Sequence, residues 1–172
     1  NVSVETVING GWVECFRSAY AASGILITTV LNKCAGPYLM LAGRATGDPV
    51  LSLLAAANRT SVLFESSTAG NGGIVSRDTH WYFSTSYSWG FSLGNDSVNR
   101  FSCDTNTNNG EYRLCWHTSN GAMSGGYRLG SAIQLNYAAN YEKIIYQVCH
   151  PGSYCLTGNN RRRKLDRVRY SK

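Results

Sequence analysis

Residues 103–120 read CDTNTNNGEYRLCWHTSN, so two cysteines enclose an asparagine-rich loop and a Trp-His pair follows the second cysteine. Asn, Asp and Gly are typical of turns, and we expect the polar stretch 95–110 to be a loop. The aromatic residues beyond it favour a strand over Tyr112–His117. The segment therefore predicts a cysteine-flanked loop that leads into a β-strand.

The chain contains six cysteines, with no CxxC pair and no Cys/His spacing typical of a metal site. They are Cys15, Cys34, Cys103, Cys115, Cys149 and Cys155. Disulfides are the better interpretation, and they indicate an oxidising, extracellular compartment. N-glycosylation sequons at Asn1, Asn58 and Asn95 agree with export. We expect a secreted, extracellular glycoprotein whose signal peptide has been removed.

Positive charge is confined to one end of the chain. Residues 1–158 contain nine Lys or Arg and nine Asp or Glu, whereas residues 159–172 contain seven basic residues and one acid. A neutral body offers no field to a polyanion, so we expect no nucleic-acid partner. We also expect no membrane span, because no apolar run approaches about 18 residues. The length of 172 residues fits a single globular domain over 1–158, followed by a basic tail over 159–172.

The basic tail has two alternative interpretations. Its densest part consists of Arg161, Arg162, Arg163 and Lys164. This run resembles a proteolytic processing signal, or it is retained and docks on an anionic partner. Val168 and Tyr170 alternate with polar residues, so the tail is also a candidate strand that joins the sheet of a neighbouring subunit. The opening strand is a candidate for the same exchange, and we expect self-association.

Hydrophobic patterning predicts a β-rich α+β fold with mainly antiparallel sheets and about two short helices. Alternation predicts an opening strand over Val2–Val7, which Asn9-Gly10-Gly11 turns into a second strand over Trp12–Phe16. For the segment Ile25–Lys33 the pattern fits either a short helix or a buried strand. Further strands are expected over Tyr38–Ala42, Thr60–Glu65, Gly126–Leu129 and Tyr141–Val148.

One helix has clear local signals. Asp48 supplies a capping carboxylate, Pro49 suits the first helical position, and the Ala/Leu-rich run Val50–Ala57 follows. This combination predicts a helix over Val50–Ala57.

Six aromatic residues crowd the twelve residues HWYFSTSYSWGF, from His80 to Phe91. Alternating rings in a strand usually fill a core, and we expect most of them to do so. The alternative is that Tyr82, Tyr87 and Trp89 form a wall of a ligand pocket.

The order of features resembles a fibrinogen-related domain of the ficolin-like lectin type. The similarity is carried by Gly10-Gly11-Trp12, by the segment 103–120 and by Gly125-Gly126-Tyr127, with Trp116 inserted between the cysteine and the histidine of the family pattern. The resemblance implies a shallow glycan pocket beside the Cys-His pair and a calcium ion held nearby. Asp96 and Asp104 are the candidate calcium ligands.

The resemblance also supports a disulfide between Cys103 and Cys115. The remaining cysteines pair by proximity in sequence as Cys15–Cys34 and Cys149–Cys155, although six cysteines allow many other connectivities.

Aromatic and polar residues around Cys115 form the candidate carbohydrate site. A sugar site needs flat aromatic rings and fixed donors and acceptors. The candidates are Tyr112, Trp116, His117, Asn120, Tyr127 and Trp89. The alternative is that these rings fill a β core.

Motifs for catalysis are scarce, and we expect no enzyme. The histidines are His80, His117 and His150, and the sequence contains no HExxH and no GxSxG. We therefore expect a lectin-like module that binds a carbohydrate or glycoprotein without chemistry. The alternative is a structural subunit of an extracellular filament, coat or matrix that assembles through terminal strands.

Overall fold

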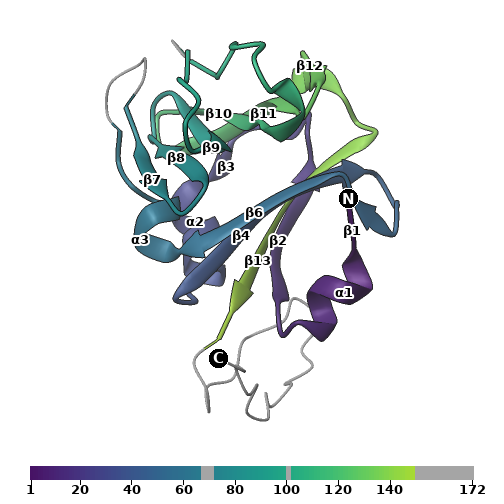
Figure 1. The fold of residues 1–172 in the computed structure, drawn as a ribbon. Coiled ribbons are helices and arrows are strands. Elements are labelled where there is room, and N and C mark those ends of the chain that lie inside the picture. The colour runs from purple at the N-terminus through teal and green to yellow at the C-terminus, as the bar shows by residue number, and fades with distance from the viewer. Residues whose placement is uncertain (67–71, 100–101, 150–172) are drawn as a thin grey trace.

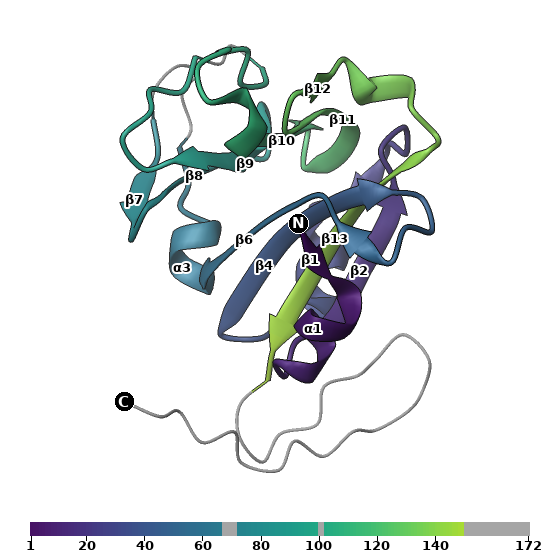
Figure 2. The same cartoon turned by 45° about the vertical axis from the view of Figure 1, so that its right-hand side comes forward.

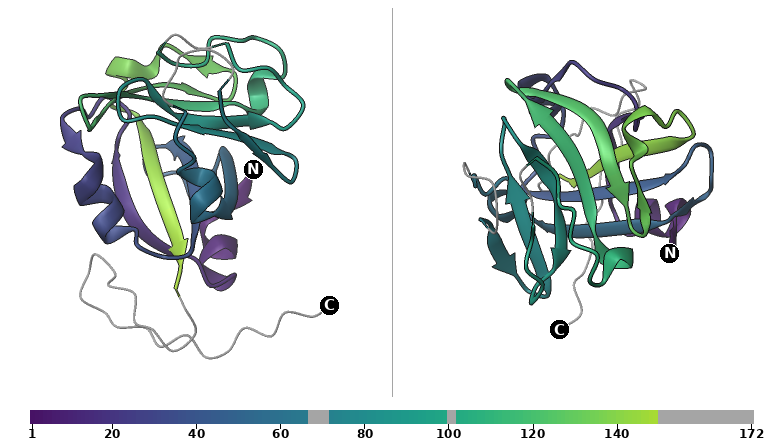
Figure 3. Two further views of the ribbon diagram at one scale, coloured as in Figure 1. Left: turned by 90° about the vertical axis from the view of Figure 1, so that its left-hand side faces the viewer. Right: turned by 90° about the horizontal axis from the view of Figure 1, so that it is seen from above.

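Two antiparallel β-sheets pack face to face and bury the main hydrophobic core between them (Figures 1 and 3). The computed structural model describes residues 1–66, 72–99 and 102–149. The four-stranded sheet has the order β2 (Val13–Ala19), β13 (Tyr141–Val148), β4 (Tyr38–Ala45) and β6 (Leu53–Asn58). This arrangement confirms a β-rich fold with antiparallel sheets.

The seven-stranded sheet forms the second layer. Its strands in order are β12 (Ala132–Ile133), β11 (Ala122–Leu129), β10 (Leu114–Ser119), β9 (Ser88–Leu93), β8 (Thr79–Phe83) and β7 (Ile74–Ser76), and β3 (Ile25–Leu26) pairs with the other end of β11. The strands expected over Tyr38–Ala42, Tyr112–His117, Gly126–Leu129 and Tyr141–Val148 are confirmed in the main, as is the strand that begins near Trp12.

The described residues form three short α-helices, where we expected about two. They are α1 (Val4–Asn9), α2 (Ile27–Lys33) and α3 (Arg59–Val62), and two 3-10 helices, η1 (Gly110–Tyr112) and η2 (Leu135–Tyr137), follow later. Helix α1 covers the outer face of the four-stranded sheet, where Val7 packs against Ile144 and Tyr146 (Figure 2). Helix α2 resolves the ambiguity of the segment 25–33, because only Ile25–Leu26 is extended.

The prediction of an opening strand over Val2–Val7 was wrong. Only β1 (Val2–Ser3) is extended, and it pairs with β5 (Val50–Leu51) of the same chain. The Ser3 side chain then accepts a hydrogen bond from the Thr6 backbone N–H, which caps α1. A cap of this kind satisfies a free N–H at the helix start and outweighs the β preference of the valines.

The helix expected over Val50–Ala57 is also wrong, because this segment forms β5 and β6. The Asp48 carboxylate accepts from the Val50 backbone N–H and makes a turn instead of a helix cap. In β6, Leu53 and Ala55 face the main core and Leu54 faces the other way, which is the alternation of a strand. Pairing with β4 from Tyr38 to Gly43 therefore overrides the helical preference of alanine and leucine.

The strand expected over Thr60–Glu65 was wrong as well. Asn58 accepts a hydrogen bond from the Ser61 backbone N–H at 2.8 Å and so starts α3. The helix buries Val62 in the main core, and Glu65 makes only an isolated bridge to Phe83.

Two disulfides appear as expected. Cys15–Cys34 ties β2 to the end of α2, and Cys103–Cys115 ties the loop after β9 to β10. Cys149 is disulfide-bonded too, and its expected partner Cys155 lies outside the described residues. Disulfides fit an extracellular or otherwise oxidising environment. Within the described part of the chain, every helix is too short or too polar to cross a membrane.

Candidate ligand-binding pocket

A pocket of about 460 Å³ opens where β10 ends. Segments distant in sequence build its wall: the connection after β2, the loop between β8 and β9, the start of the Cys103 loop, the middle of β11, and η2. Its lining residues are Ala21, Ser23, Ser86, Ser102, His117, Thr118, Ser119, Ser124, Gly125, Asn136 and Tyr137. Most of these side chains carry a hydroxyl group, and none of them is acidic.

The pocket wall at β10 depends on an irregularity in the sheet. The register between β10 and β11 shifts on both sides of Trp116, so that His117 has no partner on β11. Bulges of this kind bend a strand and redirect a side chain. Here the irregularity lies on the β11 side of His117, which still pairs with Ser88 of β9 and lines the pocket.

The other wall depends on a glycine and on η2. A Cβ at Gly125 would lie 2.7 Å from the backbone oxygen of Asn136, so only glycine lets η2 lie this close to β11. Leu135 is buried and anchors η2 in the main core. Two residues later Tyr137 is 94% exposed, and its ring stands at the pocket with almost no protein cover.

His117 is held by two neighbours. Its Nδ1 lies 2.8 Å from the hydroxyl oxygen of Ser102, and the Tyr127 ring packs edge-on against the imidazole at a centroid distance of 5.8 Å. Burial lowers the pKa of His117, and the positive charge of Lys143 lowers it further. His117 is therefore a neutral hydrogen-bonding group at neutral pH.

The two tryptophans of the expected sugar site lie in the core instead. Trp89 and Trp116 are both 0% exposed and pack edge-to-face at 5.7 Å. Their indole N–H groups donate inside the protein, from Trp89 to the carbonyl of Val62 and from Trp116 to the hydroxyl of Tyr20. A ring without exposed surface cannot stack against a sugar. These two tryptophans are therefore core residues, which was the alternative to the sugar site.

The remaining expected residues lie at separate places. Tyr127 supports His117 from the side. Asn120 and Gly121 have φ values of 49° and 77° and form the tight turn between β10 and β11. Tyr112 ends η1, is 48% exposed and does not line the pocket. Of the six expected residues, His117 alone lines the pocket.

The aromatic residues from His80 to Phe91 lie on both faces of the seven-stranded sheet. Trp81, Phe83, Trp89 and Phe91 alternate into the main core, as expected for a pair of strands. Tyr82 points the other way, is fully buried under the Cys103 loop and packs beside Cys115.

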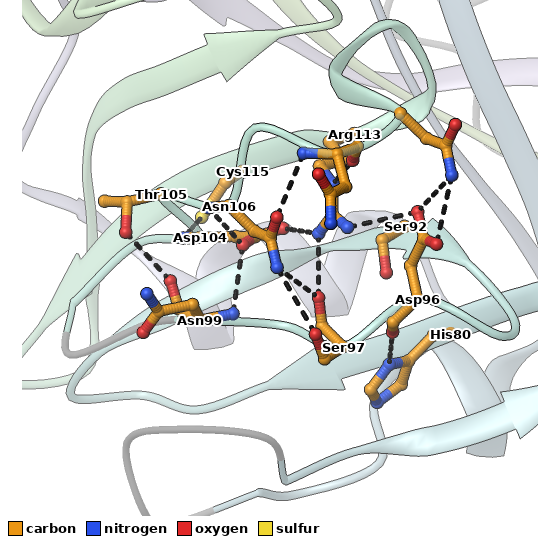
Figure 4. Close-up of polar contacts among 12 residues, drawn as sticks. His80, Ser92, Asp96, Ser97, Asn99, Asp104, Thr105, Asn106, Arg113 and Cys115 are labelled. Atoms are coloured by element: carbon orange, nitrogen blue, oxygen red, sulfur yellow. Dashed lines mark hydrogen bonds and ion pairs between the residues drawn. The ribbon is translucent and has the colours of Figure 1, made fainter.

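The Cys103 loop is fastened by a buried ion-pair network (Figure 4). The Arg113 guanidinium is 0% exposed and donates to Asp104 at 2.6 Å and to Asp96 at 3.1 Å. Asp104 also accepts from the backbone N–H groups of Asn99 and Asn106. This network keeps the segment that carries Ser102 in place.

The expected calcium site does not fit these residues. The carboxylates of Asp96 and Asp104 bind one guanidinium, which supplies the positive charge that calcium would otherwise bring. Calcium takes 6–8 oxygen ligands. Within residues 1–66, 72–99 and 102–149 no cluster of three or more acidic, histidine or cysteine side chains exists to hold a metal ion.

The three sequon asparagines, Asn1, Asn58 and Asn95, are exposed. The side-chain oxygen of Asn58 caps α3, and the Thr60 hydroxyl of the same sequon donates to that oxygen at 2.8 Å. The basic run formed by Arg161, Arg162, Arg163 and Lys164 lies outside the described residues, as does His150. Processing, docking and assembly through the tail therefore stay predictions.

Several pocket residues escaped the sequence analysis because they carry no local signal. Tyr137 is a lone aromatic in the segment QLNYAAN, and the five lining serines come from five different segments. Lys143, which lies behind the pocket, did leave a signal, since it occupies an inward-facing position between Tyr141 and Ile145, which both pack in the main core. No protein-family model, curated protein or solved structure matches the chain.

Proposed function

We propose that this protein is a lectin-like module that binds carbohydrate without catalysis in the pocket beside His117. The observation that carries the proposal is the exposed ring of Tyr137 next to a wall of hydroxyl side chains. Sugar rings offer apolar faces that stack on an aromatic ring and hydroxyl groups that need nearby polar partners. The pocket supplies both within about 460 Å³.

The position of His117 supports the proposal. The resemblance to fibrinogen-related lectins implies a glycan pocket beside a Cys-His pair, and here His117 lines a pocket directly after Cys115-Trp116. The Ser102–His117 contact alone does not favour a hydrolase. Among the described residues no carboxylate makes a hydrogen bond to His117, whereas a catalytic histidine is usually oriented by a third group.

Secretion and glycosylation belong to the same proposal. The two described disulfides fit an oxidising compartment, and the exposed side chains of Asn58 and Asn95 are accessible to glycosylation. Neither sequon asparagine lines the pocket, so glycans at these positions leave the proposed site open.

The test is Tyr137→Ala on a glycan array, followed by calorimetric titration with the best saccharide. We expect the affinity to fall about tenfold, because the variant removes the stacking surface. The melting temperature should stay unchanged, since the side chain makes almost no buried contact.

Tyr112→Ala is the matched control, because Tyr112 also ends a 3-10 helix and is half exposed but lies outside the pocket. This control should bind as the parent protein does. Equal binding by the Tyr137 and Tyr112 variants, or a parent protein that binds no saccharide, contradicts the proposal.

A further inference from the structure

Lys143 lies buried between the two sheets. It belongs to β13, the strand that β2 and β4 flank, and its side chain is 0% exposed. Successive strand residues face opposite sides, and the neighbours Glu142 and Ile144 face the outer side of the four-stranded sheet. Lys143 therefore faces the seven-stranded sheet, as Ile145 does.

Within the part of the chain that the structure describes, no negative charge balances this ammonium. Its Nζ donates to the carbonyl oxygen of Ala22 at 2.9 Å and to that of Ser124 at 2.7 Å. Among the described residues it forms no ion pair, and the adjacent Glu142 is engaged with Arg44 and Arg17 instead. Buried charges are normally paired, because two carbonyl dipoles replace the lost hydration only in part.

The unbalanced charge lies directly behind the pocket wall. Ser124 lines the pocket, and Ala21 and Ser23, on either side of Ala22, line it as well. One of the two carbonyls that hold the ammonium thus belongs to a lining residue, Ser124, and the other belongs to Ala22, which lies between two lining residues. The charge also reaches the pocket, since Lys143 lowers the pKa of His117.

We propose that the pocket takes an acidic saccharide, and that Lys143 attracts its carboxylate or sulfate group while the surrounding hydroxyls donate hydrogen bonds to it. This inference rests on the proposed carbohydrate-binding function and names the class of sugar. The lining residues carry hydroxyl groups and no acidic side chain, and a buried cation lies directly behind them, so the pocket is complementary to an anion. Burial lowers the pKa of Lys143 to about 8, so the group keeps its charge in most molecules at neutral pH.

The test compares glucose, glucuronate and a sulfated glucose by calorimetric titration of the full chain. We expect both acidic sugars to bind about tenfold or more tightly than glucose, since a nearby charge of opposite sign acts across a partly desolvated site. The two acidic probes distinguish a carboxylate preference from a sulfate preference. Lys143→Met should bind all three sugars equally, because methionine fills a similar volume without charge.

Lys33→Met is the matched control, because Lys33 is an exposed lysine at the end of α2 and does not line the pocket. It changes the net charge by the same amount and should keep the preference for acidic sugars. Equal binding of neutral and acidic sugars by the parent protein overturns the inference while carbohydrate binding stands. Binding of no sugar overturns the proposed function itself. Lys143→Gln serves as a second neutral variant if the methionine variant does not fold.

Discussion

Lys143 lowers the stability of the fold as well as having a proposed use, because its charged ammonium group is buried away from bulk solvent. Burial lowers its pKa from 10.5 to about 8. At pH values below about 8 the side chain is charged in both the folded and the unfolded chain, and the folded chain bears the full burial penalty. Between about 8 and 10.5 the folded chain releases the proton before the unfolded chain does, so stability rises with pH in this range.

We therefore predict that Lys143→Met stabilises the protein at neutral pH by up to about 3 kcal/mol and that this gain disappears toward pH 10.5. The measurement is urea unfolding of both proteins across this pH range. Tyr20 and Tyr146 also have raised pKa values because they are buried, but they titrate in both proteins and cancel in the difference. A constant difference between the proteins across the range would show that Lys143 is not held as a buried cation.

The element η2 shows how a single backbone contact positions a proposed binding residue. Tyr137 has no anchoring contact of its own, so its position follows from Leu135 in the core and from the approach of Asn136 to Gly125. The backbone oxygen of Asn136 leaves no room for a side chain at Gly125. The pocket is thus shaped by the distance between η2 and β11.

We predict that Gly125→Ala weakens saccharide binding at least about as much as Tyr137→Ala, because the new methyl group displaces η2 and the ring it carries. The protein should still fold, at a cost of about 1–3 kcal/mol. Saccharide titration and thermal melting of the variant measure the two effects separately. Full binding with reduced stability would show that the position of η2 does not matter for the ligand.

The strands and the core were predictable from the sequence where the local pattern and the long-range pairing agree. The strand assignment of Tyr141–Val148 holds, because this segment is rich in isoleucine, tyrosine and valine and pairs on both sides, with β2 and with β4. Val50–Ala57 was mispredicted because alanine and leucine favour a helix in an isolated segment. In the folded protein most of this segment pairs with β4 and forms a strand. Pairing of this kind joins distant residues and leaves no trace within the segment itself.

The candidate site was predictable only in part. His117 was found because it follows a cysteine and an aromatic residue in a recognisable segment. Trp89 and Trp116 were wrongly assigned to the sugar site, because an indole ring can either stack against a sugar or fill a hydrophobic core. Only their burial in the folded protein distinguishes the two roles. Tyr137, Ser86 and Ser124 come together only in three dimensions, since different turns and strands carry them.

The two sheets share one core, which has a consequence for how the whole molecule unfolds. Leu39, Leu41 and Ile145 from the four-stranded sheet pack with Trp89 and Trp116 from the seven-stranded sheet. Neither sheet covers its inner face without the other, so we predict one cooperative transition. Tryptophan fluorescence reports mainly on the seven-stranded sheet, which carries three of the four tryptophans, whereas far-ultraviolet circular dichroism reports on both sheets. With the disulfides kept oxidised, the two signals should give the same urea midpoint, and separate midpoints would mean that the sheets are independent folding units.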